Sequence, residues 1–179
     1  MHKILKGSAL AGFVALVATM GIIAASIDDE RPKSNVAMRN LDLDDQLNKV
    51  DHIVVGLVKE VVSPYADPNA HPEVPRYFGD VIVIVEEELR GSTGENEITV
   101  RTHHHARQAS TFTEGERALL FLIPGQPDSV EGEGVYVVSG MYQGKYDLDE
   151  AANRLIDPKD DERTYQLSEI RAKIANMTR

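Results

Sequence analysis

Three consecutive histidines, His103-His104-His105, are the residues of this 179-residue chain whose type and spacing point most directly to chemistry. Neutral imidazoles are the commonest metal ligands in proteins, and in an extended segment His103 and His105 project to the same side. Two such histidines and a carboxylate can hold zinc or copper. The same pattern is also typical of an exposed loop or strand end without a metal. A divalent metal is therefore the one cofactor that the sequence suggests.

A proline-rich segment supplies a second candidate surface. Residues 63–76 contain four of the eight prolines of the chain and lie between two strand-like stretches. Prolines stiffen and extend a loop and cannot donate to a strand ladder, so we expect a loop that stands apart from the sheet. Long loops of this kind often carry function. The candidate ligand contacts in and next to it are Tyr65, His71, Arg76 and Tyr77.

Other patterns associated with catalysis or calcium binding fail in detail. Acidic residues recur from Asp147 to Glu162, but an EF-hand loop needs a glycine where residues 153–156 intervene. The sequence contains no G-x-S-x-G turn, H-E-x-x-H helix or phosphate-binding glycine loop. Glu86, Glu87 and Glu88 are neighbours on an expected strand, so they alternate between faces rather than pair for glycoside chemistry. These failures favour a protein that is not an enzyme.

Composition excludes further classes of function. The chain has 29 acidic and 19 basic residues and a formal net charge of −10, and no block of lysines or arginines interrupts this surplus. Such a surface repels nucleic acid. The chain also contains no cysteine, which rules out disulfides, thiolate metal sites and cysteine nucleophiles.

The amino-terminal segment resembles an export signal. Lys3 and Lys6 precede the uncharged stretch Ser8–Ser26, whose last residues are small enough for a signal peptidase. An uncleaved anchor is an alternative, because these nineteen residues approach the roughly 20 needed to span a bilayer. A third interpretation is cleavage between Lys6 and Gly7 by a prepilin-type peptidase, which would leave the apolar segment attached. All three place the remainder outside the cytoplasm and limit membrane contact to residues 1–26.

The remaining sequence predicts one β-rich domain. Residues 27–50 are polar and contain Pro32, so we expect a tether that leads into a domain over residues 51–160. Five consecutive β-branched residues, Val81–Val85, predict a central strand buried on both sides. Shorter runs predict its partners: His52–Val62 with a bulge or a close backbone approach at Gly56, Glu97–Arg101, Ala118–Ile123, Val135–Ser139, and a hairpin about Ala151–Asn153.

A helix is expected at the carboxyl end, within residues 161–179. Leu167, Ile170, Ile174 and Met177 recur at helical spacing and form one apolar stripe. Five or six strands with one such helix predict a mainly β fold, either a small closed barrel or a β-sandwich. The helix would pack on it over one open end.

Several segments resemble known surface domains. Val85–Gly91 matches a V-E-x-x-L-K-G pattern, Phe112–Leu122 matches F-x-x-G-E-x-x-L-L-F-L, His52–Val58 resembles a first strand with an internal glycine, and Gln143–Tyr146 resembles a late Q-G-K-F turn. These patterns resemble bacterial and archaeal domains of the netrin/TIMP-like OB-fold superfamily over residues 51–156. The resemblance implies a five-stranded OB-type barrel that is usually exported. Together with the strand count it predicts a five- to six-stranded, OB-like antiparallel barrel. Inhibitors of that superfamily ligate a target zinc through an amino-terminal cysteine, which this chain lacks, so only the fold is carried over.

These patterns together predict an extracytoplasmic, non-enzymatic binding module. Its partner would be a protein or a cell-envelope component, contacted through the proline-rich loop and the adjoining barrel face. The alternative is a secreted metal-binding or metal-dependent protein centred on His103 and His105.

Overall fold

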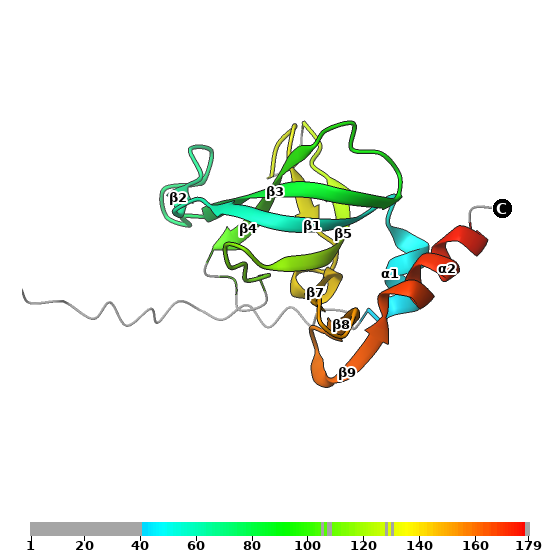
Figure 1. Cartoon of the computed structure of the whole chain (residues 1–179). Helices are drawn as coiled ribbons and strands as arrows, with labels where there is room; N and C mark the ends of the chain where they lie inside the picture. Colours follow the sequence, from blue (N-terminus) through cyan, green and yellow to red (C-terminus); the bar gives the residue numbers. More distant parts are fainter. Residues whose placement is uncertain (1–40, 105, 107–108, 128, 130, 178–179) are drawn as a thin grey trace, which may run out of the picture. The chain divides into compact units, whose positions relative to one another are not determined.

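The computed structural model describes residues 41–104, 106, 109–127, 129 and 131–177 (Figure 1). Its elements are α1 (Leu43–Lys49), β1 (His52–Val61), β2 (Tyr65–Ala66), β3 (Tyr77–Arg90), β4 (Glu97–His104), β5 (Arg117–Pro124), β6 (Tyr136–Val138), the 3-10 helix η1 (Met141–Gly144), β7 (Lys145–Asp149), β8 (Arg154–Asp157), β9 (Asp160–Gln166) and α2 (Leu167–Met177). The expected signal or anchor over residues 1–26 lies outside the described residues. Within them, no helix has the length and apolar character needed to cross a bilayer.

Five strands close a barrel in the order β1-β3-β4-β6-β5, and β5 returns to pair with β1. The pairs are antiparallel except for β4 with β6, which run parallel at Val100–Arg101 and Tyr136–Val137. The expectation of a small, mainly β barrel is confirmed, while the expectation of a wholly antiparallel one is wrong at that pair. The strand order is compatible with an OB-like fold.

The bulge expected at Gly56 is confirmed. The register of β1 against β3 shifts between Val55 and Gly56. A Cβ atom at Gly56 would lie 2.4 Å from Cγ1 of Val83, which is shorter than any van der Waals contact. A glycine therefore lets β1 and β3 approach closely where the barrel wall bends.

Two hydrophobic cores lie on opposite sides of the β1–β5 wall. All five barrel strands contribute to the barrel interior: Val54, Val58, Val81, Val83, Ile98, Val100, Ala118, Leu120, Leu122 and Val138. The intervening residues of β1 and β5 point outward and meet both helices and the β7–β8 hairpin. This outer core contains Leu43, Leu47, Val50, Ile53, Val55, Leu119, Phe121, Tyr146, Leu155, Leu167, Ile170 and Ile174.

The central strand β3 is not buried on both sides, contrary to expectation. Val81 and Val83 are 2% and 0% exposed, whereas Ile82 and Ile84 on the other face are only half-buried. A run of β-branched residues predicts a strand, but it does not show whether another element packs on the outer face of that strand. The apolar run Ala118–Leu122 of β5 is covered on both faces, because the helices and the β7–β8 hairpin pack over its outer side.

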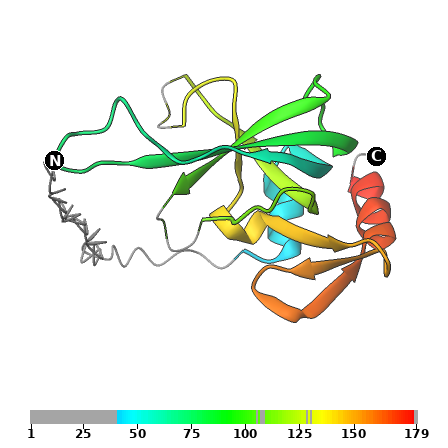
Figure 2. The ribbon, with the colours of Figure 1, turned by 60° about the vertical axis from the view of Figure 1, so that its left-hand side comes forward.

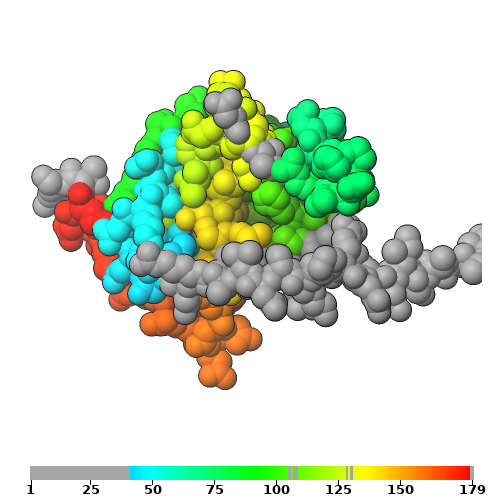
Figure 3. All heavy atoms as spheres, turned by 180° about the vertical axis from the view of Figure 1, so that it is seen from behind, coloured from blue at the N-terminus to red at the C-terminus, as the bar shows by residue number. Residues whose placement is uncertain are grey.

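The tether expected over residues 27–50 is corrected at its carboxyl end. Asp42 caps α1 by accepting a hydrogen bond from the Asp45 backbone N–H at 2.8 Å. Leu43 and Leu47 are buried in the outer core, and the Gln46 side chain donates to the Ser139 carbonyl at 3.4 Å. Figure 3 shows α1 (cyan) on the surface beside α2 (red). The folded domain therefore includes residues 41–50.

The carboxyl-terminal segment begins with a strand rather than a helix. The expected hairpin about Ala151–Asn153 is confirmed as β7–β8, and β9 pairs with β8 before leading into α2 (Figure 2). Leu167, Ile170 and Ile174 are buried, but Met177 is 43% exposed. The buried stripe belongs to the outer core and not to the barrel interior, so the expectation of a helix over an open end of the barrel is wrong.

Candidate binding face

The histidine-rich end of β4 lies next to the proline-rich loop. Contrary to expectation, this loop joins the sheet, because β2 pairs with β3 through Tyr65 and Ala66. The ladder places Tyr65 opposite Phe78, and Phe78 opposite His103. Cross-strand partners share one face of a sheet, so these three rings form a row. Ring centroids are 6.2 Å apart for Tyr65 and Phe78 and 5.3 Å apart for Phe78 and His103.

This row lies on the outer face of the barrel. Phe78 alternates with the inward-facing Gly79 and Val81, and on β4 Arg101 and His103 alternate with the buried Val100. The face continues toward the middle of the barrel as an aliphatic strip. It consists of the half-buried side chains of Leu57, Ile82 and Ile84, and the half-buried Thr99 lies beside Ile82 in the strand register.

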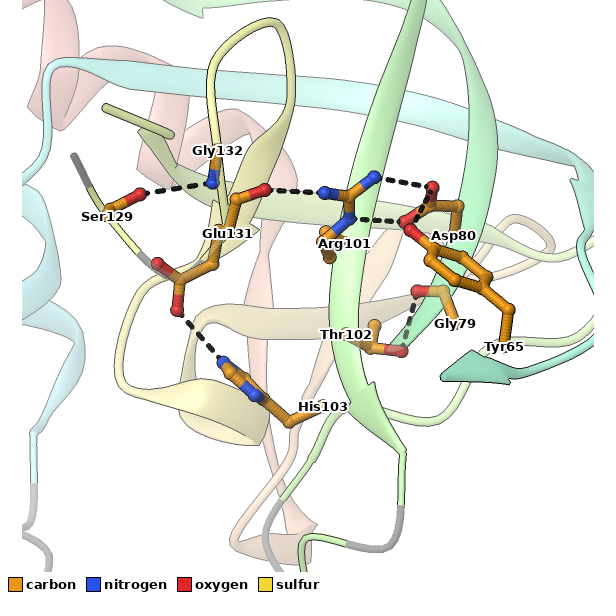
Figure 4. Close-up of polar contacts among 9 residues, drawn as sticks. All are labelled: Tyr65, Gly79, Asp80, Arg101, Thr102, His103, Ser129, Glu131 and Gly132. Carbon is orange, nitrogen blue, oxygen red and sulfur yellow. Dashed lines mark hydrogen bonds and ion pairs between the residues drawn. The ribbon is translucent and has the colours of Figure 1, made fainter. Parts of the chain in front are cut away.

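Arg101 is at the centre of the polar contacts on this face (Figure 4). Its Nε and Nη2 donate to the two carboxylate oxygens of Asp80, each at 2.8 Å, in a bidentate pair. The Tyr65 hydroxyl donates to the same carboxylate at 2.9 Å. The side chains of Arg101 and Asp80 are only 20% and 17% exposed, so water screens this pair weakly.

The surroundings shift the titration of these groups. The hydrogen bond to Asp80 raises the pKa of Arg101, and burial opposes this only in part. Burial and the hydrogen bond to Asp80 together raise the pKa of Tyr65 to about 12. The Arg101 guanidinium also lies 5.7 Å from the ring centre of Tyr65 and 5.3 Å from that of Phe78. At neutral pH Arg101 is therefore a cation and Tyr65 a neutral phenol.

Glu131, in the loop that joins β5 to β6, contacts the other side of Arg101. Nη1 of Arg101 donates to the backbone carbonyl of Glu131 at 2.5 Å, and the Glu131 carboxylate lies 3.0 Å from Nε2 of His103. Burial alone would raise the pKa of Glu131. Hydrogen bonds from its own backbone N–H, His103 and Ser129 outweigh burial and lower that pKa. Glu131 is thus held as a carboxylate.

A pocket of about 200 Å³ opens beside these residues, where β4 continues past the point at which β6 ends its pairing. Arg101, Thr102, His103, Ser110 and Glu131 supply its polar lining. The apolar lining comes from Ala109, Val137, Val138 and Met141. The pocket is large enough for a side chain or a small molecule.

The structure places the expected ligand residues in different settings. Tyr65 belongs to the Arg101 cluster. Arg76 is held by Asp67, with 2.7 Å between Nη2 and Oδ2. Tyr77 pairs with His104 in the ladder and therefore faces away from the Tyr65 row. His71 is exposed, and its Nδ1 accepts the Glu73 backbone N–H at 3.3 Å.

Of the two histidines expected to bind a metal, the structure describes only one. His103 lies beside Glu131, while His105 is outside the described residues. Among the side chains that the structure describes, no three of histidine, aspartate or glutamate gather closely enough to hold a metal ion. What the structure adds is a carboxylate next to His103.

Four residues of the face escape sequence reasoning: Phe78, Asp80, Arg101 and Glu131. A faint signal exists for Arg101 and Asp80, since Arg101 is an outward residue of a strictly alternating strand and Asp80 is its cross-strand partner once the register is known. Nothing local marks Glu131, which is 28 positions from His103 in the chain. No protein-family model matches the chain, and a comparison with curated proteins finds no significant match.

Proposed function

We propose that this protein is an extracytoplasmic, non-enzymatic binding module. Its ligand surface would be the outer face of β3 and β4 between the loops 63–76 and 125–134, which we call the β3–β4 face. The observation that carries the proposal is which side of the barrel the described residues leave uncovered. Helices α1 and α2 and the β7–β8 hairpin pack on the outside of β1 and β5, whereas Ile82 and Ile84 on the outside of β3 stay half-exposed.

The position of this face supports a binding role. OB barrels bind their ligands on the face of their second and third strands, between the loop that joins strands one and two and the loop that joins strands four and five. In this barrel those elements are β3 and β4, the proline-rich loop 63–76 and the loop 125–134. The sequence resemblance to netrin/TIMP-like OB domains, which are usually exported, agrees with this assignment and with the expected signal or anchor in residues 1–26.

The chemistry of the face favours a protein or envelope component over nucleic acid. The chain carries a net charge of −10, and the guanidinium of Arg101 is already satisfied by Asp80 and a backbone carbonyl, so it is not available to a phosphate. The tip of the proline-rich loop adds an apolar contact point, because Val74 is 67% exposed. An aliphatic strip beside aromatic rings is typical of the core of a protein–protein contact.

Site-specific photocrosslinking tests the proposal. A photoreactive phenylalanine analogue would replace Thr99 on the β3–β4 face, Val74 on the loop tip, or Glu162 on the exposed strand β9 as the control. The variants would be expressed in cells that make the protein naturally. We expect the same crosslinked partner from the first two positions and none from the control. Equal products at all three positions, or none at the first two, would refute the β3–β4 face as the ligand surface.

Metal binding at His103 is a second candidate, favoured by the Glu131 carboxylate 3.0 Å from its Nε2. In a tetrahedral zinc site with bonds of about 2.0–2.1 Å, two ligand atoms lie about 3.3 Å apart, so an ion could replace the shared proton after a small movement. These two side chains would supply the protein ligands that the structure describes, and His105 is the further donor that the sequence suggests.

Zinc and copper titrations of tag-free protein decide this candidate. A specific site predicts that His103→Ala and Glu131→Gln each weaken binding, while His71→Ala, which alters an exposed histidine of the proline-rich loop, does not. Identical titrations for all of these proteins would show adsorption to surface histidines only.

A further inference from the structure

We infer that Arg101 is a positioning residue that couples the two loops flanking the β3–β4 face, so that they are ordered and displaced together. The inference rests on the proposed binding role for its biological meaning, but the coupling is a property of the free protein. Through this coupling, the Arg101 side chain sets the shape of a surface that is built from segments far apart in the chain.

The geometry of the Arg101 guanidinium sets the directions of its hydrogen bonds. Its N–H groups lie in one plane with fixed directions, so partners on different edges are held in a fixed relation to each other. One edge of Arg101 binds the Asp80 carboxylate through two hydrogen bonds of 2.8 Å. Another N–H binds the Glu131 carbonyl at 2.5 Å. A shift of either partner must therefore strain or break the bond to the other.

Each partner is in turn tied to one loop. The Asp80 carboxylate accepts the Tyr65 hydroxyl at 2.9 Å, and Tyr65 lies at the start of the proline-rich loop. The Glu131 carbonyl belongs to the loop 125–134, where the Gly132 backbone N–H donates to Ser129 at 3.2 Å. Figure 4 shows the resulting chain of contacts, from Tyr65 through Asp80 and Arg101 to Glu131.

The surroundings make these contacts strong enough to transmit a displacement. Arg101 and Asp80 are mostly shielded from water, and charge-assisted bonds in such a setting are stronger than exposed ones. The guanidinium also lies near the rings of Tyr65 and Phe78. By contrast, Arg117 bridges Glu86 and Glu150 on the barrel surface, with no loop of the β3–β4 face among its partners.

Residue-resolved amide hydrogen exchange on the ligand-free protein tests the coupling. The Asp67 amide, bonded to the Arg76 carbonyl, reports on the loop 63–76, and the Gly132 amide reports on the loop 125–134. The Val58 amide, bonded to the Glu116 carbonyl, reports on the barrel. In Arg101→Met we expect both loop amides to exchange about tenfold faster while Val58 is unchanged.

Further variants keep the test decisive. Arg101→Lys retains the charge but not the planar fork, so it should protect the loops less than arginine and more than methionine. If Arg101→Met unfolds because Asp80 loses its charged partner, the exchange rates of the two loops in Arg101→Lys test the coupling instead. Arg117→Met, the matched control, should leave both loops as they are. Tyr65→Phe should speed exchange at Gly132, although it alters only the other loop.

The outcomes separate this inference from the proposed function. Faster exchange in one loop only, or no change at Gly132 in Tyr65→Phe, would overturn the coupling even if crosslinking finds a partner on the face. Coupled loops without any crosslinked partner would instead leave Arg101 as the positioning residue and remove the proposed binding role.

Discussion

Replacing Leu47 with alanine tests whether residues 41–50 belong to the folded domain. Leu47 is 1% exposed and lies in the outer core with Ile53 and Val55 of β1. An undocked tether would tolerate this change, whereas a docked helix would lose buried apolar contacts. The loss of stability in Leu47→Ala should therefore be small if residues 41–50 are a tether, as the sequence predicted, and large if α1 is docked, as in the structure.

The magnitude follows from burial and from how well the site can close. Truncating a fully buried leucine costs about 2–5 kcal/mol, and the cost rises with the cavity that remains. Helix α1 has only seven residues and meets one side of the barrel, so it can move partly into the space. We expect a loss of about 3 kcal/mol from a total stability of about 5–15 kcal/mol. The melting temperature should fall by about 10 °C.

Urea denaturation followed by circular dichroism measures this loss directly. Asn48→Ala is the control, because Asn48 is the exposed neighbour on the same helix and its side chain donates to the Asp44 carbonyl at 2.8 Å. It should change stability by less than about 0.5 kcal/mol. Deletion of residues 1–40 should preserve cooperative unfolding, and deletion of residues 1–50 should not. If Leu47→Ala matches Asn48→Ala within error, α1 is not part of the core.

Three further predictions concern the other helix, the bulge and the phenol. Ile170→Ala should cost about 2–5 kcal/mol in denaturation, because Ile170 is 3% exposed, whereas Arg171→Ala should cost less than about 1 kcal/mol; equal costs would mean that α2 is undocked. Gly56→Ala should cost about 1–3 kcal/mol, because its Cβ would lie 2.4 Å from Val83, and a melt identical to the parent would disprove this close approach. The folded-state pKa of Tyr65 is raised to about 12, so its stabilising contribution is complete below the unfolded pKa of about 10 and disappears as pH rises through 12. An ultraviolet pH titration compared with Tyr65→Phe should show this late transition, and ionisation near pH 10 would contradict it.

Local patterns in the sequence were sufficient to predict the main strands, the bulge and the buried stripe of the helix. Strict alternation placed Ile98 and Val100 inside β4, and the internal glycine of β1 marked the bulge at Gly56. The spacing of Ile170 and Ile174 gave the buried stripe of α2. These features follow from side-chain periodicity and backbone freedom, which depend on neighbours in the chain.

The same patterns could not show what covers an element. The predicted strands Val81–Val85 and Ala118–Ile123 are both unbroken apolar runs, yet only the second is covered on its outer side, and there only over Ala118–Leu122. Short polar helices such as α1 carry few apolar residues, so their sequence does not show that they pack on the domain. The surface that buries those few residues exists only in the tertiary structure.

The candidate face was decided almost entirely by tertiary structure. The sequence alone marked His103 and Tyr65 as candidates, because imidazoles and loop aromatics stand out by type. It could not place Tyr65 two strands away from His103, or bring Glu131 to both His103 and Arg101. Those contacts depend on strand register and on the closure of the barrel through the parallel β4–β6 pair, which are long-range pairings that no local segment encodes.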